Sequence, residues 1–345
     1  MKFIVENSAE IKDIIEYHND IEIPDYSKNL KEIKQNKNIV ILGNFDGVHK
    51  GHQIILKKSV NKAKEENLKS IVYTFNEYPK NKQTKITTCS EKAYLLNENG
   101  IDYLYLEQFE KVRNYTPKEF VEKVLVDTLN AKEVYCGFNF TFGKEKSGDV
   151  STLEKLLKEK NIKLNVQEPV RDENKEIISS TRVRNYIKEG NFEKVRKLLG
   201  HNFIILGEVI YGKQLGRVIG FPTANLRFEN KIYPEFGVYG VKICIQDDEK
   251  VYNGVMNIGR NPTVDVGVLS VETNIFDFNE DIYGKVIFIE ILENIRHERK
   301  FESIDELKEQ IGKDQQQAND FNSNHVNEER VFNEHIKRNI KKKNR

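Results

Sequence analysis

Two histidines stand three residues apart in a glycine-rich segment near the start of the chain, GNFDGVHKGH over residues 43–52. The segment follows an aliphatic run and leads into an expected helix, whose N-terminal N–H groups and dipole favour negative charge. The spacing can bring both imidazoles to one side of the first turn, where they can donate to phosphate oxygens. The alternative is a tight turn with an exposed His pair. The residues predicted to line a phosphate site are Gly43, Asn44, Phe45, Asp46, His49 and His52.

A second glycine-rich segment, GEVIYGKQLGRVIGFPTAN, covers residues 207–225. It follows an expected strand, and its four glycines suggest a backbone loop wrapped around phosphates. No GKS or GKT sequence follows, so it is not a Walker A loop. On the glycines alone, a corner of a β-barrel explains the segment equally well.

Two further segments are weak signals of a site when taken alone. Residues 137–149, GFNFTFGKEKSGD, are typical of a Gly/Lys surface loop when taken alone. Residues 177–184, IISSTRVR, place hydroxyl groups at a helix start, where they can cap the helix and also bind triphosphate oxygens. Arg184 follows one turn later and can pair with phosphate as a fixed fork.

Up to about residue 168, β-rich runs alternate with helical stretches. Strands are expected at 38–43, 70–75, 102–107, 133–137 and 163–168, and helices at 53–66, 91–99, 116–130 and 151–161. This alternation predicts βαβ units and a parallel sheet. Thr116 is expected as an N-cap, with Pro117 in the first turn, and Ser151 as another helix opener. Two short helices, divided at Gly190-Asn191, are expected between 181 and 199.

Beyond Gly200, β-type runs follow one another with short polar links, at 203–212, 236–246, 250–259, 269–278 and 285–295. Consecutive strands with little helix between them predict an antiparallel barrel or sandwich. Ser303 and Glu306 form an expected capping box for a closing helix over 304–314. The polar end of the chain carries six basic residues in IKRNIKKKNR and is interpreted as a frayed or disordered tail, with a nucleic-acid or partner contact as the lesser alternative.

Composition limits the classes of function. The chain has 345 residues, a soft prior for about two domains of ~150 residues each. Its 55 Lys and Arg against 54 Asp and Glu argue against a chain-wide nucleic-acid or membrane binder. Cys89, Cys136 and Cys244 lie far apart, without the CxxC spacing of a zinc site or a disulfide framework. No apolar run approaches the ~20 residues of a membrane span, and the acidic N-terminus does not resemble a signal peptide. We expect a soluble cytoplasmic protein.

Taken in order, these segments resemble the motifs of prokaryotic bifunctional riboflavin kinase/FAD synthetases. GNFDGVHKGH contains the HxGH signature of class I nucleotidyltransferases, and its extended form is similar to the adenylyltransferase module of that family. One departure is Asn76 in TFNEYPK, where the family commonly has an Asp and a further Pro. The resemblance implies a second set of nucleotide-binding residues in this module, namely Asn139, Ser179, Ser180, Thr181 and Arg184.

The second half resembles the riboflavin kinase module through GRVIGFPTAN and the segments that follow it. The resemblance implies that Thr223 and Asn225 hold Mg²⁺ and nucleotide phosphates, and oxygen donors of this kind suit Mg²⁺. It also places Glu272 at the catalytic carboxylate and Asn274 where many members have His, a change not expected to touch the chemistry. Arg296 and Phe301 are expected near the flavin. The implied nucleotide-binding residues of this module are Gly212, Lys213, Gly216, Arg217, Gly220, Pro222, Thr223 and Asn225.

The resemblance implies two modules. An α/β nucleotidyltransferase domain with a Rossmann-like parallel sheet is expected over residues 1–199, an antiparallel β-barrel kinase domain with a terminal helix over 200–318, and a polar basic tail over 319–345. The barrel would phosphorylate riboflavin with ATP to give FMN, and the α/β domain would join FMN to AMP from a second ATP to give FAD and pyrophosphate. Mg²⁺ is the expected cofactor. The expected partners are small molecules only (riboflavin, FMN and ATP), with no nucleic acid and no membrane, in a monomer or weak homo-oligomer.

Two other interpretations remain at this stage. One is an HxGH adenylyl- or cytidylyltransferase with an unrelated β domain, and GRVIGFPTAN argues against it. The other is a flavin-sensing regulator that kept the fold and lost turnover. The presence of His49, His52, Thr223, Asn225 and Glu272 argues against that.

Overall fold

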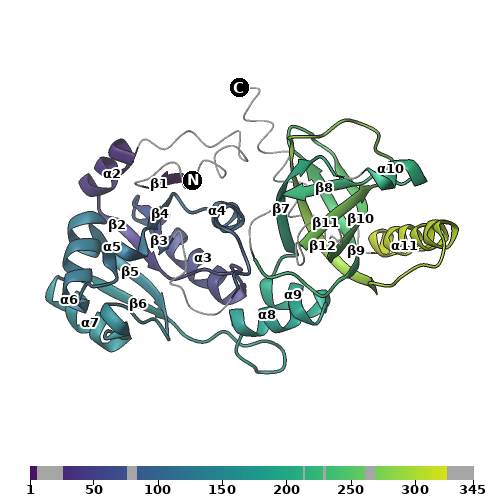
Figure 1. Ribbon diagram of the computed structural model, residues 1–345. Helices are drawn as coiled ribbons and strands as arrows, with labels where there is room; N and C mark the ends of the chain where they lie inside the picture. Colours follow the sequence, from purple (N-terminus) through teal and green to yellow (C-terminus); the bar gives the residue numbers. More distant parts are fainter. Residues whose placement is uncertain (6–25, 76–83, 213, 228–230, 261–268, 325–345) are drawn as a thin grey trace. The chain divides into compact units, whose positions relative to one another are not determined.

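The structure is a computed structural model of the chain, and it describes residues 1–5, 26–75, 84–212, 214–227, 231–260 and 269–324 (Figure 1). The chain divides into two compact units, Met1–Ser180 and Thr181–Arg345. By this division the two short helices before Gly200 fall in the second unit. The domain boundary at 199/200 stays a prediction, and Asn76 and Lys213 lie outside the described residues.

Within the described part of the first unit, six strands form one parallel sheet in the order β1-β4-β3-β2-β5-β6. The strands are β1(Lys2–Ile4), β2(Asn38–Leu42), β3(Lys69–Phe75), β4(Tyr103–Glu107), β5(Ala131–Gly137) and β6(Lys163–Gln167). The predicted parallel sheet is confirmed. Sequence reasoning missed β1, which has three residues and therefore too little length for a periodic pattern.

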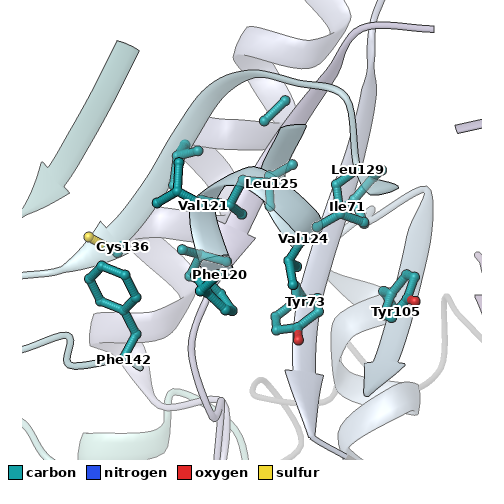
Figure 2. Close-up of a cluster of buried hydrophobic side chains, with 14 of the residues drawn as sticks. Ile71, Tyr73, Tyr105, Phe120, Val121, Val124, Leu125, Leu129, Cys136 and Phe142 are labelled. Atoms are coloured by element: carbon teal, nitrogen blue, oxygen red, sulfur yellow. The ribbon is translucent and has the colours of Figure 1, made fainter. Parts of the chain in front are cut away.

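Helices cover both faces of this sheet. They are α2(Tyr26–Gln35), α3(Lys50–Glu65), α4(Cys89–Glu98), α5(Phe109–Val112), α6(Pro117–Glu119), the π-helix η2(Phe120–Thr128), the 3₁₀ turn η3(Lys144–Lys146) and α7(Val150–Glu159). Val40 and Leu42 point into a cluster with η2 and α7, part of which Figure 2 shows between η2 and the strands. The alternate residues Ile39 and Ile41 are equally buried, and α3 packs along β2. Burial on both faces explains the continuous aliphatic run of β2.

The order in which the chain adds strands to the sheet switches sides at β2. From β2 the chain first builds β3 and β4 on one side and later places β5 and β6 on the other. In open α/β sheets, ligands bind beyond the carboxyl ends of the strands at such a switch point. The segment after β2 and the segment after β5 therefore flank the expected ligand position, and these segments contain His49 and Asn139.

Two short helices open the second unit, α8(Ser180–Lys188) and α9(Phe192–Leu199). The division between the units falls after Ser180, the first residue of α8. Asn191 caps α9. In the described residues that follow, the antiparallel strands close into a barrel in the order β10-β11-β8-β7-β12-β9. The remaining elements are β7(Phe203–Ile210), α10(Leu215–Ile219), β8(Ala224–Arg227), β9(Gly237–Ile245), β10(Val251–Arg260), β11(Leu269–Ile275), β12(Val286–His297) and α11(Ile304–Asn324). The predicted barrel is confirmed, and β8 was not expected.

Helix α11 packs on the outside of the barrel, against β9, β10 and β12 (Figure 1). Val238, Val255 and Ala318 form a buried cluster at this contact. The helix is longer than predicted, because residues 319–324 continue it where the tail was expected to begin. Residues 325–345 lie outside the described residues.

Candidate active sites

The loop after β2 turns sharply and is packed from inside. Phe45 (φ 50°), Gly47 (φ 78°) and Val48 (φ 39°) all adopt left-handed backbone conformations. These conformations are unfavourable for Phe and Val, and their burial at 1% and 0% exposure offsets that cost. A Cβ on Gly43 would lie only 3.0 Å from the Phe45 ring, so a larger residue at the start of the loop would require that ring to shift. Asn44 remains exposed at the tip.

Asp46 ties this loop to the segment before α4. Its Oδ1 atom accepts hydrogen bonds from the backbone N–H groups of Ile86 (2.9 Å) and Thr87 (3.2 Å). The N–H of Gly47 in turn donates to Oγ1 of Thr87 at 3.1 Å. Ser180, at the start of α8, donates through Oγ to the Asp46 carbonyl at 3.0 Å. Asp46 is thus a structural anchor, and a direct contact of its side chain with nucleotide stays a prediction.

The two histidines of the motif are stacked. Their ring centroids are 3.7 Å apart with an interplanar angle of 13°. His49 caps α3, and its Nδ1 atom accepts from the His52 N–H at 3.4 Å. A Cβ on Gly51 would lie 3.1 Å from Cε1 of His49, so glycine between the histidines makes room for the ring. The predicted placement of both imidazoles on one side of the first turn is confirmed.

His52 is held in its neutral form. Burial, with the nearby charges of His49 and Lys92, places the pKa of His52 well below its usual 6.5. Its Nδ1 atom is buried and has no hydrogen-bond partner within the described residues. A neutral imidazole has one donor and one acceptor nitrogen, so it can still donate to a phosphate oxygen. The orphaned ring nitrogen is a polar group for which a ligand would supply the partner.

The structure places the other predicted residues of this site on two segments, the loop after β5 and the start of α8. Asn139 follows β5 and is exposed beside Gly137, at the strand end next to β2. Ser179 and Ser180 lead into α8, and Ser180 contacts the HxGH loop through Asp46. Thr181 and Arg184 follow in α8, in the second unit. Their contact with a nucleotide stays a prediction.

In the barrel, the glycine-rich loop packs directly on the PTAN segment. A Cβ on Gly212 would overlap the Asn225 side-chain amide. A Cβ on Gly216 would overlap the Phe221 carbonyl and approach Oγ1 of Thr223 to 3.3 Å. Gly220 has a φ of 92° and ends α10 in a conformation that favours glycine. The predicted glycines therefore let the backbone reach Thr223 and Asn225, whereas Arg217 and Pro222 are exposed on the loop.

Glu272 lies beside both of the predicted magnesium ligands. It stands opposite Asn225 in the pairing of β8 with β11. Oγ1 of Thr223 donates to one carboxylate oxygen of Glu272 at 3.5 Å, and Oγ of Ser270 donates to the other at 3.3 Å. A hydroxyl, an amide and a carboxylate thus converge at one edge of the barrel. Such a group suits the positioning of a hydroxyl substrate next to Mg²⁺ and phosphate.

Arg296 makes an ion pair with the buried Asp314 in this structure. Its Nε atom donates to both carboxylate oxygens of Asp314, at 3.0 and 2.9 Å, and this pair ties β12 to α11. Its guanidinium carbon lies 5.5 Å from the ring centroid of Phe301, where Arg299 also stacks at 4.7 Å. The flavin contact predicted for Arg296 and Phe301 stays a prediction, because the observed partners are protein groups.

Sequence reasoning missed residues whose role depends on contacts distant in sequence. Thr87 anchors the HxGH loop, and Lys92 on α4 is 2% exposed. Burial lowers the pKa of Lys92, while Cys89 and Asp46 act in the opposite direction. Asp46 bonds to Ile86 and Thr87, which lie about forty residues later in the sequence. A contact over that distance leaves no pattern in the sequence, so only the fold could identify it.

Comparison with known proteins assigns each unit. A model of the FAD synthetase family matches residues 31–182, and a model of the riboflavin kinase family matches residues 199–322. The chain is 39% identical to the bifunctional riboflavin kinase/FMN adenylyltransferase of Bacillus subtilis over 84% of its own length and 94% of the relative. The chain belongs to the bifunctional riboflavin kinase/FMN adenylyltransferase family. The resemblance found in the motifs is confirmed, and the alternative of an unrelated β domain is wrong.

Another member of the family and one solved structure are similar to this chain over most of its length. The riboflavin kinase/FMN adenylyltransferase of Escherichia coli K12 is 35% identical over 85% of this chain and 95% of the relative. A crystal structure described as a macrolide-efflux protein from Streptococcus pneumoniae is 35% identical, with a TM-score of 0.74 over 83% of this chain and 95% of that one. None of the helices in the described residues is long and apolar enough to cross a membrane. The kinase model includes Thr223, Asn225 and Glu272, and the FAD synthetase model includes His49 and His52.

Proposed function

We propose that this chain converts riboflavin to FAD in two steps at two separate sites. The observation that supports the proposal is that each unit holds one phosphate-binding motif whose side chains lie close together. The first unit places stacked His49 and His52 at the switch point of a parallel sheet. The second unit places Thr223 and Asn225 beside Glu272.

At the kinase site, the 5′-hydroxyl of riboflavin attacks the γ-phosphorus of ATP. A new O–P bond forms, the bond to the β,γ-bridging oxygen breaks, and ADP leaves. We assign Glu272 as the general base that orients the hydroxyl and accepts its proton. The backbone of the glycine-rich loop would lie on the phosphates. Gly212 and Gly216 already bring it against Asn225 and the Phe221 carbonyl, where a side chain would not fit.

Thr223 and Asn225 fit the Mg²⁺ that this reaction needs. Mg²⁺ takes hard oxygen ligands and binds through one or two protein groups plus substrate phosphates and water. Within the described residues, no group of three or more His, Cys, Asp or Glu side chains could hold a metal ion, and a site built on Thr223 and Asn225 requires none. When bound, Mg²⁺ would neutralise negative charge on the phosphates.

At the adenylyltransferase site, a phosphate oxygen of FMN attacks the α-phosphorus of a second ATP, and pyrophosphate leaves. FMN is already ionised, so the step needs no strong base. His49, His52, Asn139, Arg184 and nearby backbone N–H groups would stabilise the charge on the α-phosphate and on pyrophosphate. Neutral His52 would act by donating a hydrogen bond rather than by supplying a full positive charge.

We further propose that the protein works in the cytoplasm on small molecules alone, as a monomer or weak homo-oligomer. All three cysteines are free thiols, and two of them, Cys136 and Cys244, are buried. Burial raises the pKa of the Cys136 thiol to about 12, so it is an inert core residue.

One assay tests the proposal. The protein is incubated with riboflavin, ATP and Mg²⁺, and flavins are separated by chromatography. FMN followed by FAD is the expected result. FMN alone would refute the adenylyltransferase assignment of the first unit. The absence of both products would favour a flavin-binding regulator without turnover.

A further inference from the structure

A chain of hydrogen bonds links helix α11 to the PTAN loop through Asn274. The amide nitrogen of Asn274 donates to the Pro222 carbonyl at 2.7 Å. Its amide oxygen accepts from Nε2 of Gln315 at 2.9 Å. Asn274 is 7% exposed and lies two residues after Glu272 on β11.

The Pro222 carbonyl fixes the orientation of both amides in this series of hydrogen bonds. A proline carbonyl can only accept, so Asn274 must turn its NH₂ group toward Pro222 and its oxygen toward α11. The oxygen then requires a donor, and the NH₂ group of Gln315 supplies it. Each amide therefore has one orientation, and Pro222 immediately precedes Thr223.

The turn of α11 that carries Gln315 is itself held firmly. Asp314, its neighbour, is 2% exposed and pairs with Arg296 of β12. One turn later, Ala318 packs against Val255, which stands opposite Asn274 in the pairing of β10 with β11. These contacts fix the position of Gln315 on α11 relative to the barrel.

We propose that Asn274 and Gln315 are positioning residues of the kinase site, which hold the Pro222 carbonyl and thereby the backbone that presents Thr223 and Asn225. The side-chain bonds of Asn274 run to the PTAN loop and to α11, so it would act through the loop. Asn274 stands where many members of the family have His, and its amide makes two specific bonds. The inference rests on the proposed role of Thr223 and Asn225 in binding Mg²⁺ and ATP.

The test measures FMN formation by the full-length protein while Mg²⁺–ATP and riboflavin are varied separately. A net hydrogen bond is worth about 0.5–1.5 kcal/mol, or roughly a two- to tenfold change in affinity. Asn274→Ala should raise KM for Mg²⁺–ATP by about three- to tenfold and leave KM for riboflavin within about twofold. Asn274→Asp should be at least as harmful, because it keeps the acceptor for Gln315 but turns a carboxylate oxygen toward the Pro222 carbonyl.

Gln315→Ala gives a second and milder test, since the side chain is only half-buried and the variant should fold. It should raise the same KM by about two- to threefold, and the double variant should be no worse than Asn274→Ala, because Gln315 acts through Asn274. Gln316→Ala is the matched control. Gln316 neighbours Gln315 on α11 but is exposed and donates to Asp320 at 2.9 Å, so its removal should change nothing.

A merely structural role would lower the amount of folded enzyme, and hence the apparent kcat, with KM unchanged. That outcome, or fully additive effects of the two substitutions, would overturn the inference. Thr223→Val separates this inference from the proposed function. If Thr223→Val weakens Mg²⁺–ATP binding and Asn274→Ala does not, only the positioning role fails. If Thr223→Val leaves Mg²⁺–ATP binding normal, both fail.

Discussion

Glu272 and Asn225 face each other across the pairing of β11 with β8, and Thr223 reaches the same carboxylate at 3.5 Å. The register of two strands therefore brings the proposed base of the kinase step beside the proposed magnesium ligands. A slip of one residue would turn Glu272 to the other face of the barrel and separate these groups.

Glu272→Gln should lower FMN formation by about 10²–10⁴-fold, the usual contribution of a general base. The amide keeps the size and one acceptor oxygen but cannot take a proton, so binding of ATP and riboflavin should change little. Stopped assays of FMN formation from riboflavin measure the effect.

Asp281→Asn is the matched control for that experiment. Asp281 is a carboxylate that follows Glu272 in the sequence, but its Oδ1 accepts from the Tyr283 N–H at 3.0 Å, as expected of a turn residue. Its substitution should leave kinase turnover within a few-fold of normal. Near-normal turnover by the Glu272→Gln protein would remove the general base from the mechanism and leave positioning and Mg²⁺ as the whole account.

His49→Ala or His52→Ala should abolish FAD formation and leave FMN formation nearly intact. Both histidines lie in the first unit and the kinase residues lie in the second, and each unit buries its own set of hydrophobic side chains. Flavin chromatography after incubation with riboflavin gives both activities at once. Equal loss of both activities in a folded variant would be incompatible with two sites.

The stability of the protein should depend on pH through His52. Its pKa is lower in the folded chain than the usual 6.5 of an unfolded histidine. Below about pH 6.5 the unfolded state therefore binds more protons, and the folded state loses up to about 1.4 kcal/mol per pH unit.

His52→Gln removes this dependence but keeps a polar side chain. The Tm difference between the wild type and this variant should shift in favour of the variant between pH 7.5 and pH 5.5. An unchanged difference across that range would show that His52 has an ordinary pKa in the folded protein.

Removal of the residues after 325 should change neither activity by more than a few-fold. The segment is polar and basic, and it follows the end of α11 at Asn324. Truncated and full-length proteins are compared for FMN and FAD formation and for Tm. A large loss of activity at unchanged Tm would mean that the tail reaches a site.

Local patterns predicted the elements of this fold well. Thr116 caps α6 in a full capping box, with Pro117 in the first turn, as expected. Other details depended on competition between neighbours. Asp149, rather than Ser151, caps α7. Ser303 accepts from the Glu306 N–H, but the Glu306 side chain reaches the N–H of Glu302, so only half of the expected box forms.

The sites were predictable where short motifs carry the chemistry and unpredictable where distant segments meet. Stacking of His49 on His52 follows from their spacing, whereas the bonds of Asp46 to Ile86 and Thr87 follow from the fold. The ion pair of Arg296 with Asp314 also follows from the fold. The sequence predicted the helix that contains Asp314 but not its packing against β12. Pairings across the sheet and barrel are set by packing, which one sequence does not reveal.

The central claim is that two independent sites act in sequence, and a complementation assay tests it most directly. The Glu272→Gln protein alone should make FAD readily from FMN but only very slowly from riboflavin, and the His52→Ala protein alone should accumulate FMN. An equimolar mixture of the two, given riboflavin, ATP and Mg²⁺, should produce FAD, because FMN released by one protein reaches the intact site of the other. A mixture of folded variants that forms no FAD from riboflavin would contradict the account.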